Sequence, residues 1–303
     1  MLYIINVQTG ALIQKLDTGV GTTTNPAGLA QATGFTQNVA DGTIEQIYAG
    51  DLLGNVWRFD LSEPAIDSSG NATPAYPSPN LFATLTDPSG NPQPITTAPR
   101  IEESVSANDL TTIRWVFVGT GKFLDISDLS NTQQQTLYAI MDGSGPTPST
   151  TGLPVTRSNL TADTNLLTGE VIPATSFGWY YDLTNSAGTN GGTERVVVSP
   201  DAVAGIGDVV WATLVPSSDP CSLSSNIYVT NFNGESQLVG SSGAMAYLSI
   251  SNAATTGASF IQNSSGQVAI LAGSSTNSIN IYNIQPPSLS NNLNRYNWRE
   301  ILN

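Results

Sequence analysis

The sequence contains no histidine and only one cysteine, Cys221. Without an imidazole, neither a Ser–His–Asp nor a Cys–His catalytic set can form, and zinc loses its usual nitrogen ligand. A single cysteine can form no internal disulfide and no cysteine cluster for a metal, so Cys221 is interpreted as a structural residue. These absences exclude the histidine-dependent hydrolases and the histidine- or cysteine-ligated metal centres.

Basic residues are scarce as well. The chain has 9 lysines and arginines against 23 acidic residues, a net charge of −14, and its two lysines are Lys15 and Lys122. A nucleic-acid partner needs a basic surface that releases counterions, and no such surface can be assembled here. Anionic lipid is disfavoured for the same reason. The acidity is interpreted as a contribution to solubility.

Long apolar runs are missing too. No stretch approaches the ~18–20 residues of a membrane span, so no span is expected. The amino terminus also lacks the basic region and apolar core of a secretion signal. Residues 2–7 instead read as a buried strand. We therefore expect the chain to begin inside a larger β-structure whose earlier part is missing.

Chain breakers are abundant. The sequence holds 28 glycines and 18 prolines, and few windows of ten residues lack them, so long helices are not expected. The hydrophobic content of 39% is sufficient for a packed core. Together these features predict an all-β globular structure.

The most informative segment is residues 47–61, which predict a β-hairpin with a tight turn from Asp51 to Asn55. In its second strand Trp57 and Phe59 alternate with Arg58, as expected for a strand with one buried face. The pattern recurs without a gap at residues 271–284, where Ala-Gly and an aromatic residue occupy matching positions. An internal repeat predicts a repeat architecture.

Further units follow the same plan of an apolar strand, a turn and a second strand that ends before Asp or Asn. They begin at residues 115–121 and 209–214 and are completed at residues 136–142 and 227–232. Such units predict propeller blades, with a β-sandwich as the structural competitor. Three glycines should end the inner strands near the axis, where backbones crowd: Gly50, Gly119 and Gly273. The tryptophans are interpreted mainly as core or blade-interface residues: Trp57, Trp115, Trp179, Trp211 and Trp298.

The units are spaced more widely than the ~40–50 residues of ordinary blades. The surplus lies in polar insertions at residues 62–80, 86–98, 142–175 and 185–193. Loops of this kind on a rigid scaffold are either binding loops or solvated elaborations of the fold.

Several stretches resemble the PilC/PilY family, the type IV pilus tip-associated adhesins. The hairpin at residues 48–61, Tyr-Ala-Gly-Asp-Leu-Leu-Gly-Asn-Val-Trp-Arg-Phe-Asp-Leu, is similar to the signature hairpin of that family. Other similar stretches follow in the family's order, at residues 116–129, 178–183, 194–197, 214–221 and 297–302. The resemblance covers nearly the whole chain.

The resemblance implies a fold and a role. The carboxyl-terminal domain of the family is a modified seven-bladed β-propeller, of which about four to five blades are visible here, so residues 1–303 would be the carboxyl-terminal part of one such domain. The implied location is extracellular, at the pilus tip or the bacterial outer surface. The implied partners are pilins, minor pilins, and a host-cell or abiotic surface. The implied roles are pilus biogenesis, control of retraction, twitching motility and adhesion, without enzymatic activity.

Family members often carry an EF-hand-like calcium loop just before the signature hairpin. On that register Asp41 and Glu45 match the liganding positions, whereas earlier positions fall on Gln37 and Val39. Valine cannot ligate, and calcium takes six to eight oxygens. The resemblance therefore implies at most a weak site made by Asp41, Glu45 and Gln37, with a degenerate turn as the favoured alternative. No other cofactor is expected.

Two other interpretations stay open. Quinone-dependent dehydrogenases are also propellers, and the segment Gly54–Leu61 is superficially similar to their tryptophan-bearing motifs. The lack of histidine and of a dense acidic cluster near the inner strands argues against such an enzyme. The second interpretation is a scaffold fragment that binds no ligand.

Overall fold

The structure is a computed structural model. It describes residues 1–37, 40, 42–62, 76–105, 111–144, 148–183, 192–202, 207–219, 222–240, 242–262 and 268–284. These residues form β-strands and two short 3-10 helices, η1 (Ile126–Ser130) and η2 (Arg157–Asn159). The predicted all-β class is confirmed. No helix among them is long and apolar enough to cross a membrane.

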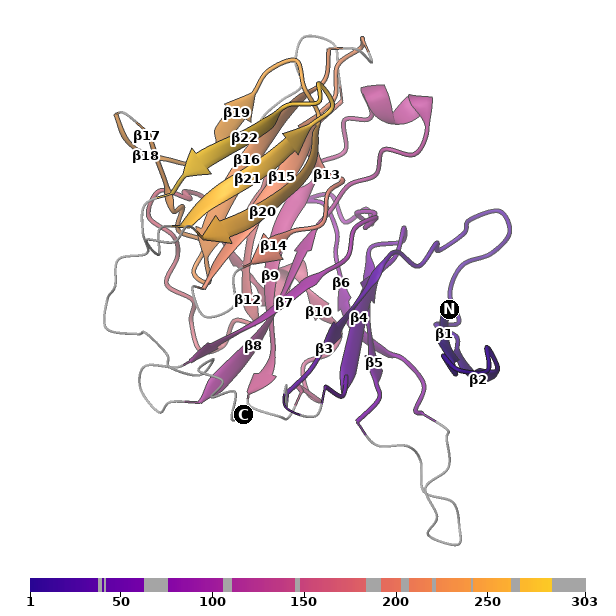
Figure 1. The fold of residues 1–303 in the computed structure, drawn as a ribbon. Coiled ribbons are helices and arrows are strands. Elements are labelled where there is room, and N and C mark those ends of the chain that lie inside the picture. Colours follow the sequence, from indigo (N-terminus) through magenta and orange to yellow (C-terminus); the bar gives the residue numbers. More distant parts are fainter. Residues whose placement is uncertain are drawn as a thin grey trace, which may run out of the picture.

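Four sheets follow one another along the chain, and we number them 1 to 4 (Figure 1). Sheet 1 contains β3 (Ala32–Phe35), β4 (Gln46–Gly50), β5 (Asn55–Asp60), β6 (Asn80–Thr84) and β10 (Val155–Thr156). Sheet 2 contains β7 (Arg100–Val105), β8 (Thr112–Gly119), β9 (Thr136–Ser144), β12 (Gly178–Asp182) and β11 (Thr161–Ala162).

Sheet 3 contains β13 (Arg195–Val196), β14 (Asp201–Ala202), β15 (Asp208–Val215), β16 (Ser224–Asn231) and β19 (Leu248–Ile250). Sheet 4 contains β20 (Thr255–Gln262), β21 (Val268–Ser274) and β22 (Ile279–Asn283). Two separate hairpins are β1 (Leu2–Ile5) with β2 (Leu12–Leu16), and β17 (Leu238–Gly240) with β18 (Gly243–Met245). A strand is present at residues 2–5 of the expected 2–7, and it pairs with β2. The expected burial is wrong, because Tyr3 and Ile5 are 54% and 56% exposed and the hairpin covers sheet 1 with only one of its faces.

The repeated hairpin predicted from the sequence is confirmed in its register. In β4–β5, Ile47 is opposite Phe59, and in β21–β22, Ile270 is opposite Tyr282. These pairs occupy equivalent positions in the two copies. Antiparallel pairing also joins β8 to β9 and β15 to β16, as expected for the other two units.

One five-residue turn reverses the described chain four times, at residues 51–55, 87–91, 231–235 and 274–278. In each copy the first residue donates its N–H to the carbonyl of the fifth, and the fourth donates to the carbonyl of the first. The fourth residue has a positive φ, between 58° and 85°, and is glycine in three copies and Asn277 in the last. This is the pattern of a type I turn followed by a left-handed residue, which suits antiparallel hairpins.

Sheets 1, 2 and 3 bury both faces. Val116 and Val118 of β8 contribute to the core between sheets 1 and 2, whereas Trp115 and Phe117 contribute to the core between sheets 2 and 3. A third core lies between sheets 3 and 4. Successive side chains of a strand point to opposite faces, so each central strand supplies two cores at once. Trp57, Trp115, Trp179 and Trp211 are all buried, as predicted, and Trp298 lies outside the described residues.

The one-sided burial expected for residues 57–61 is wrong. Trp57 is 5% exposed, and Arg58 on the opposite face is only 3% exposed. The alternation is real, but the β1–β2 hairpin covers one face of sheet 1, with Leu2 and Ile4 packed near Trp57 and Phe59, and sheet 2 covers the other. Alternation of apolar and charged residues therefore does not mark a solvent-facing side here.

The three glycines lie in other strands than the sequence predicted, but close approach of a neighbouring segment is the reason for glycine at two of them. Gly50, Gly119 and Gly273 lie in β4, β8 and β21, which are the second strands of their sheets and not the first. A Cβ on Gly50 would lie 2.3 Å from Cγ2 of Ile95, and a Cβ on Gly119 would lie 2.5 Å from Cγ2 of Val196. Ile95 belongs to the segment that leads into sheet 2, and Val196 belongs to β13 of sheet 3. Close approach of another segment is what requires glycine at these two positions.

Two of the predicted polar insertions are packed into the structure. In residues 86–98, Gln93 and Ile95 are fully buried. In residues 142–175, β10 adds to β6 of sheet 1 and β11 adds to β12 of sheet 2, both in parallel. Residues 148–162 are therefore a strap that adds an edge strand to each of two neighbouring sheets. Residues 63–75 and 184–191, in the other two insertions, lie outside the described residues.

Replacing Trp57 by alanine should lower the free energy of unfolding by roughly 3–5 kcal/mol, the usual cost of removing a large buried aromatic side chain. The indole is packed between sheet 1 and the β1–β2 hairpin, and its Nε1 donates to Oδ2 of Asp51 at 2.8 Å. Urea denaturation measures the change. Ile281→Ala on β22, where the side chain is 61% exposed, is the control and should shift stability by about 0.5 kcal/mol or less. Equal unfolding midpoints for the two variants would contradict the buried position of Trp57.

Candidate functional site

The densest group of buried charges lies between sheets 1 and 2. Arg58 of β5 donates from Nη1 to Oδ1 of Asp142 on β9 at 2.6 Å, and Tyr48 of β4 donates from its hydroxyl to Oδ2 of the same carboxylate at 2.5 Å. Arg58 and Asp142 are 3% and 0% exposed. Charged hydrogen bonds of this kind are among the strongest in proteins. Burial, with the neighbouring Asp142 carboxylate, raises the pKa of Tyr48 far above its usual value, so the hydroxyl stays a donor.

The strap joins the same group. Ser149 donates its N–H to Oδ1 of Asp142 at 2.9 Å, and its carbonyl accepts from Nη2 of Arg58 at 2.9 Å. Asp142 thus connects strands of both sheets with the segment that spans their outer edges. The one signal for this arrangement in the sequence is an arginine between two aromatic residues. The alternation alone predicts a solvent-facing position for that arginine.

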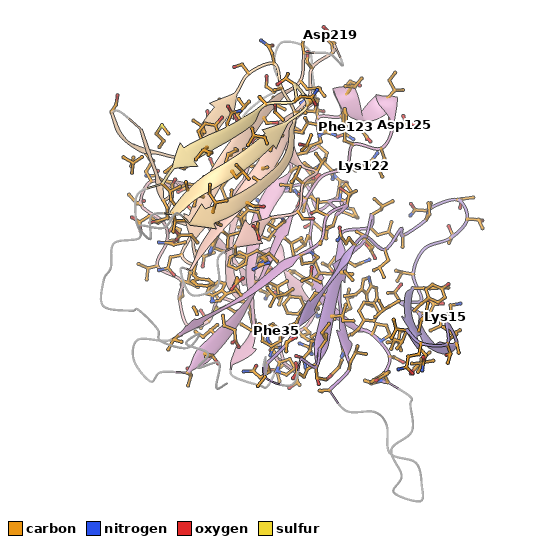
Figure 2. The ribbon with its side chains drawn as sticks, viewed as in Figure 1. Lys15, Phe35, Lys122, Phe123, Asp125 and Asp219 are labelled. Carbon is orange, nitrogen blue, oxygen red and sulfur yellow. The ribbon has the colours of Figure 1, made fainter. Side chains whose placement is uncertain are left out.

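A second arginine completes the group. Arg114 of β8 is fully buried and donates from Nη1 to Oε1 of Gln46 at 3.1 Å and to the hydroxyl of Tyr48 at 3.3 Å. Its guanidinium carbon lies 3.8 Å from the centre of the Phe35 ring, in cation–π geometry. Figure 2 marks the position of Phe35 at the base of sheet 1. The two arginines are thereby held between the sheets by acceptors and an aromatic face.

Two of the three residues proposed for a weak calcium site meet at the edge of this group. Oε1 of Gln37 accepts from Nη2 of Arg114 at 3.4 Å, and Oε2 of Glu45 accepts from the backbone N–H of Gln37 at 2.8 Å. Asp41, the third residue, and Val39 lie outside the described residues. Glu45 and Gln37 are therefore brought together, as the register implies.

Two oxygens of the proposed set already have donors within the protein. The Gln37 amide oxygen accepts from the Arg114 guanidinium, and one Glu45 carboxylate oxygen accepts from a backbone N–H. No group of three or more His, Cys, Asp or Glu side chains within the described ranges could hold a metal ion. The positive charge of Arg114 beside Gln37 opposes the binding of a cation at that oxygen. The calcium assignment stays a prediction.

Another buried carboxylate, that of Glu194, lies within sheet 3, directly before β13. Its Oε1 accepts from the hydroxyls of Thr213 on β15 and Tyr228 on β16 and, at 3.0 Å, from Nδ2 of Asn226 on β16. Glu194 belongs to one of the stretches that resemble the family, and the structure gives it a role in joining strands of one sheet. Asp142 thus connects two sheets, whereas Glu194 connects strands within sheet 3.

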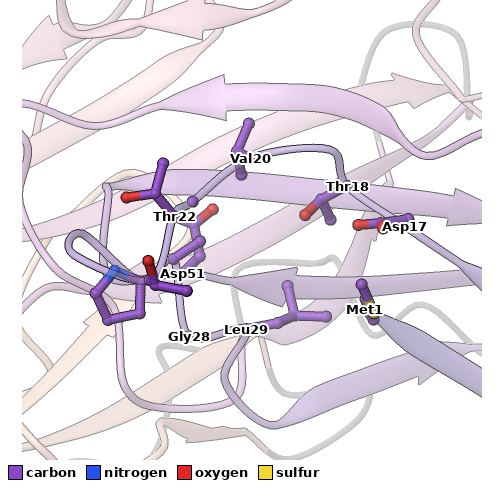
Figure 3. A pocket seen from close by; sticks show the side chains of 12 residues that line it. Met1, Asp17, Thr18, Val20, Thr22, Gly28, Leu29 and Asp51 are labelled. Atoms are coloured by element: carbon purple, nitrogen blue, oxygen red, sulfur yellow. The ribbon is translucent and has the colours of Figure 1, made fainter.

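A hollow lies beside the amino-terminal hairpin (Figure 3). Its volume is about 460 Å³, and it is lined by residues 17–18, 20–23 and 26–29 together with Met1 and Asp51. The Asp51 carboxylate accepts from Leu53, Asn55 and Trp57 and so belongs to the turn. Asp17 is exposed and accepts from the N–H of Gly19. This lining pairs no acid with a base or nucleophile, so it offers no arrangement for catalysis.

Replacing Asp142 by alanine should lower the free energy of unfolding by about 3–5 kcal/mol, because Arg58 would remain buried without its carboxylate. The double variant Arg58→Met/Asp142→Leu should recover most of the loss, since apolar side chains often replace a buried ion pair without penalty. Chemical denaturation measures both. A single variant as stable as the double one would show that the pair is not buried.

We predict no calcium affinity tighter than about millimolar, the weak end of the range for extracellular calcium modules. Isothermal titration calorimetry on the folded chain measures it. If weak binding is found, Asp41→Ala should abolish it, and Asp17→Ala, an exposed acid outside the loop, is the control. Micromolar affinity that survives Asp41→Ala would contradict both the residue assignment and the weakness of the site.

A family model described as the PilY1 beta-propeller domain matches residues 1–172. The type IV pilus biogenesis factor PilY1 of Pseudomonas aeruginosa strain PAO1 is 30% identical over 265 residues, which cover 73% of this chain and 21% of that protein. A PilY1 homolog of Xylella fastidiosa is 27% identical over 281 residues, 87% of this chain and 21% of the homolog. The chain thus spans about a fifth of the length of these relatives.

Among solved structures, the C-terminal domain of Pseudomonas aeruginosa PilY1 is similar, with a TM-score of 0.66 and 22% identity. The match covers 94% of this chain and 66% of that one. This likeness confirms the β-propeller predicted from the repeated hairpins, and the four sheets are consistent with the expected blades. Because the family model covers more than half of the chain, the chain belongs to the PilY1 beta-propeller domain family.

Proposed function

We propose that this chain is the propeller portion of a non-enzymatic type IV pilus biogenesis factor that works through protein contacts. The observation that carries the proposal is the family membership, together with relatives that are named type IV pilus biogenesis factors. The buried hydrogen bonds are consistent with this proposal. Asp142 and Glu194 accept from donors on neighbouring strands, and these bonds support a rigid scaffold. The names of the relatives lend no support to the quinone-dependent alternative.

The finer parts of the proposal concern place and partners. We place the protein outside the cell, at the pilus tip or on the bacterial outer surface, in contact with pilins and minor pilins. There it favours extension of the pilus against retraction and contributes to attachment to host-cell or abiotic surfaces. Residues 1–303 supply one continuous part of the propeller in this proposal.

Deletion of the encoding gene should strongly reduce surface pili, and complementation with the intact gene should restore them. Electron microscopy counts the surface pili, and a twitching assay measures motility. Deleting the gene in a strain that lacks the retraction motor distinguishes the two roles. Pili that return in that background indicate opposition to retraction, whereas pili that stay absent indicate a role in assembly.

A deletion strain with normal pili and normal twitching would show that the proposed function is wrong. The matched control is a strain complemented with a Trp57→Ala variant at the same expression level. Because Trp57 is packed inside the propeller, a loss of pili in that strain would show that the folded propeller is required.

A further inference from the structure

The segment that follows the strap packs into the core between sheets 2 and 3. We define residues 163–170 as the latch; it begins directly after β11. Leu166 of the latch is 1% exposed and belongs to the same core as Trp179 of β12. Opening of the latch would therefore draw an apolar side chain out of that core.

The latch is held on a turn of sheet 3, residues 231–235. The N–H of Glu170 donates to the carbonyl of Asn233 at 2.9 Å. The N–H of Ser236, directly after the turn, donates to the carbonyl of Leu166 at 2.6 Å. Backbone hydrogen bonds from both partners thus join the latch to sheet 3, and the two amides report whether it is closed.

Asp163 begins the latch and buries a carboxylate oxygen against the same turn. The residue is 4% exposed, and its Oδ1 accepts the N–H of Asn165 at 2.9 Å. Its Oδ2 is buried and has no hydrogen-bond partner among the described residues. This oxygen faces the backbone of Gly234, where a Cβ would lie only 2.3 Å from it. A buried oxygen without a donor is costly, above all when the carboxylate is charged.

Other aspartates that hold turns in the described chain use both of their oxygens. Asp51 accepts hydrogen bonds at Oδ1 and Oδ2 from groups of its own hairpin. Asp128 accepts at one oxygen from Lys122 and at the other from the N–H of Leu124. Such hydrogen bonds favour the charged form of a carboxyl group. Asp163 has none at Oδ2, so its charged form is disfavoured while the latch is closed.

In the described elements packed around Asp163, the charged groups are acidic or already paired. Glu170 lies in the latch and Glu235 in the turn. The arginine of the strap, Arg157, is paired with Asp182 of β12. Burial raises the pKa of the Asp163 carboxyl from its usual 3.8 to about 6, and the nearby Glu170 carboxylate adds to the rise. The surroundings thus favour the neutral form in mildly acidic conditions.

We propose that residues 163–170 form a pH-sensitive latch, which the neutral Asp163 carboxyl keeps closed and which loosens when that group loses its proton. The latch is independent of the proposed function. Its stabilisation is fully present below about pH 4 and is lost as the pH rises through about 6, because the open state releases the proton more readily. Opening should therefore be easier at neutral pH than in mild acid.

Hydrogen exchange followed by mass spectrometry tests the latch on the intact chain. Peptides that contain Glu170 and Ser236 report its opening, after correction for the intrinsic pH dependence of amide exchange. Between pH 5 and pH 7.5 their protection should fall about tenfold, as follows from a pKa of 3.8 in the open and about 6 in the closed state. Asp163→Asn should abolish the fall, since it keeps an acceptor for Asn165 but carries no charge at either pH.

Two other aspartates provide the controls. Asp17 is exposed and accepts the N–H two residues further on, as Asp163 does, so Asp17→Asn should keep the tenfold fall. Asp208 of β15 is a second buried acid, whose pKa burial raises to about 7, and it lies opposite Asn231 of the same turn. Asp208→Asn should also keep the fall, which separates this acid from the one in the latch.

Several results would overturn the latch. One is a fall in protection that survives Asp163→Asn or that Asp208→Asn abolishes. Another is equal protection at both pH values in the unaltered chain. A fall of the same size at the amides of Val116 and Val118 in β8 would also overturn it, because the pH dependence would then belong to the whole propeller.

Discussion

The structure depends on one constraint: each central sheet must bury both of its faces. In β8 this requires Val116 and Val118 to fit the core with sheet 1 while Trp115 and Phe117 fit the core with sheet 3. A sheet of an ordinary sandwich can place its charges on a solvated face. Here a charge on either side of a strand has to find a partner in the next sheet or in a connecting segment.

The polar contacts between sheets follow from that constraint. Arg58 is on the face of β5 that meets sheet 2, and it forms an ion pair there with Asp142 of β9. A buried ion pair contributes little net stability, but removal of one partner is costly, so the pair penalises any arrangement that separates the two sheets. Hydrophobic packing alone tolerates many arrangements. The carboxylate of Asp142 therefore specifies how sheets 1 and 2 meet.

Local features were predictable from the sequence because their causes are local. The hairpin of residues 47–61 and its copy were recognised from alternation and turn residues, and both adopt the same register. The depth of burial of Arg58 was not predictable, because it depends on which strand lies across the interface. The strap was missed for the same reason: Val155 of β10 lies opposite Ala83 of β6, a residue far away in the sequence. Of the calcium residues, Gln37 and Glu45 were correctly placed together, but the neighbouring Arg114 comes from a strand 77 positions further along the chain.

Carboxylates of the described residues hold the scaffold together in several ways. Asp51 and Asp87 hold turns. Asp142 joins sheets 1 and 2, and Glu194 joins strands within sheet 3. Asp128 accepts from the backbone N–H of Leu124 in the segment after β8. Each of these carboxylates accepts hydrogen bonds from donors of the protein itself, and such bonds favour a rigid scaffold, as the proposed role in protein contacts requires.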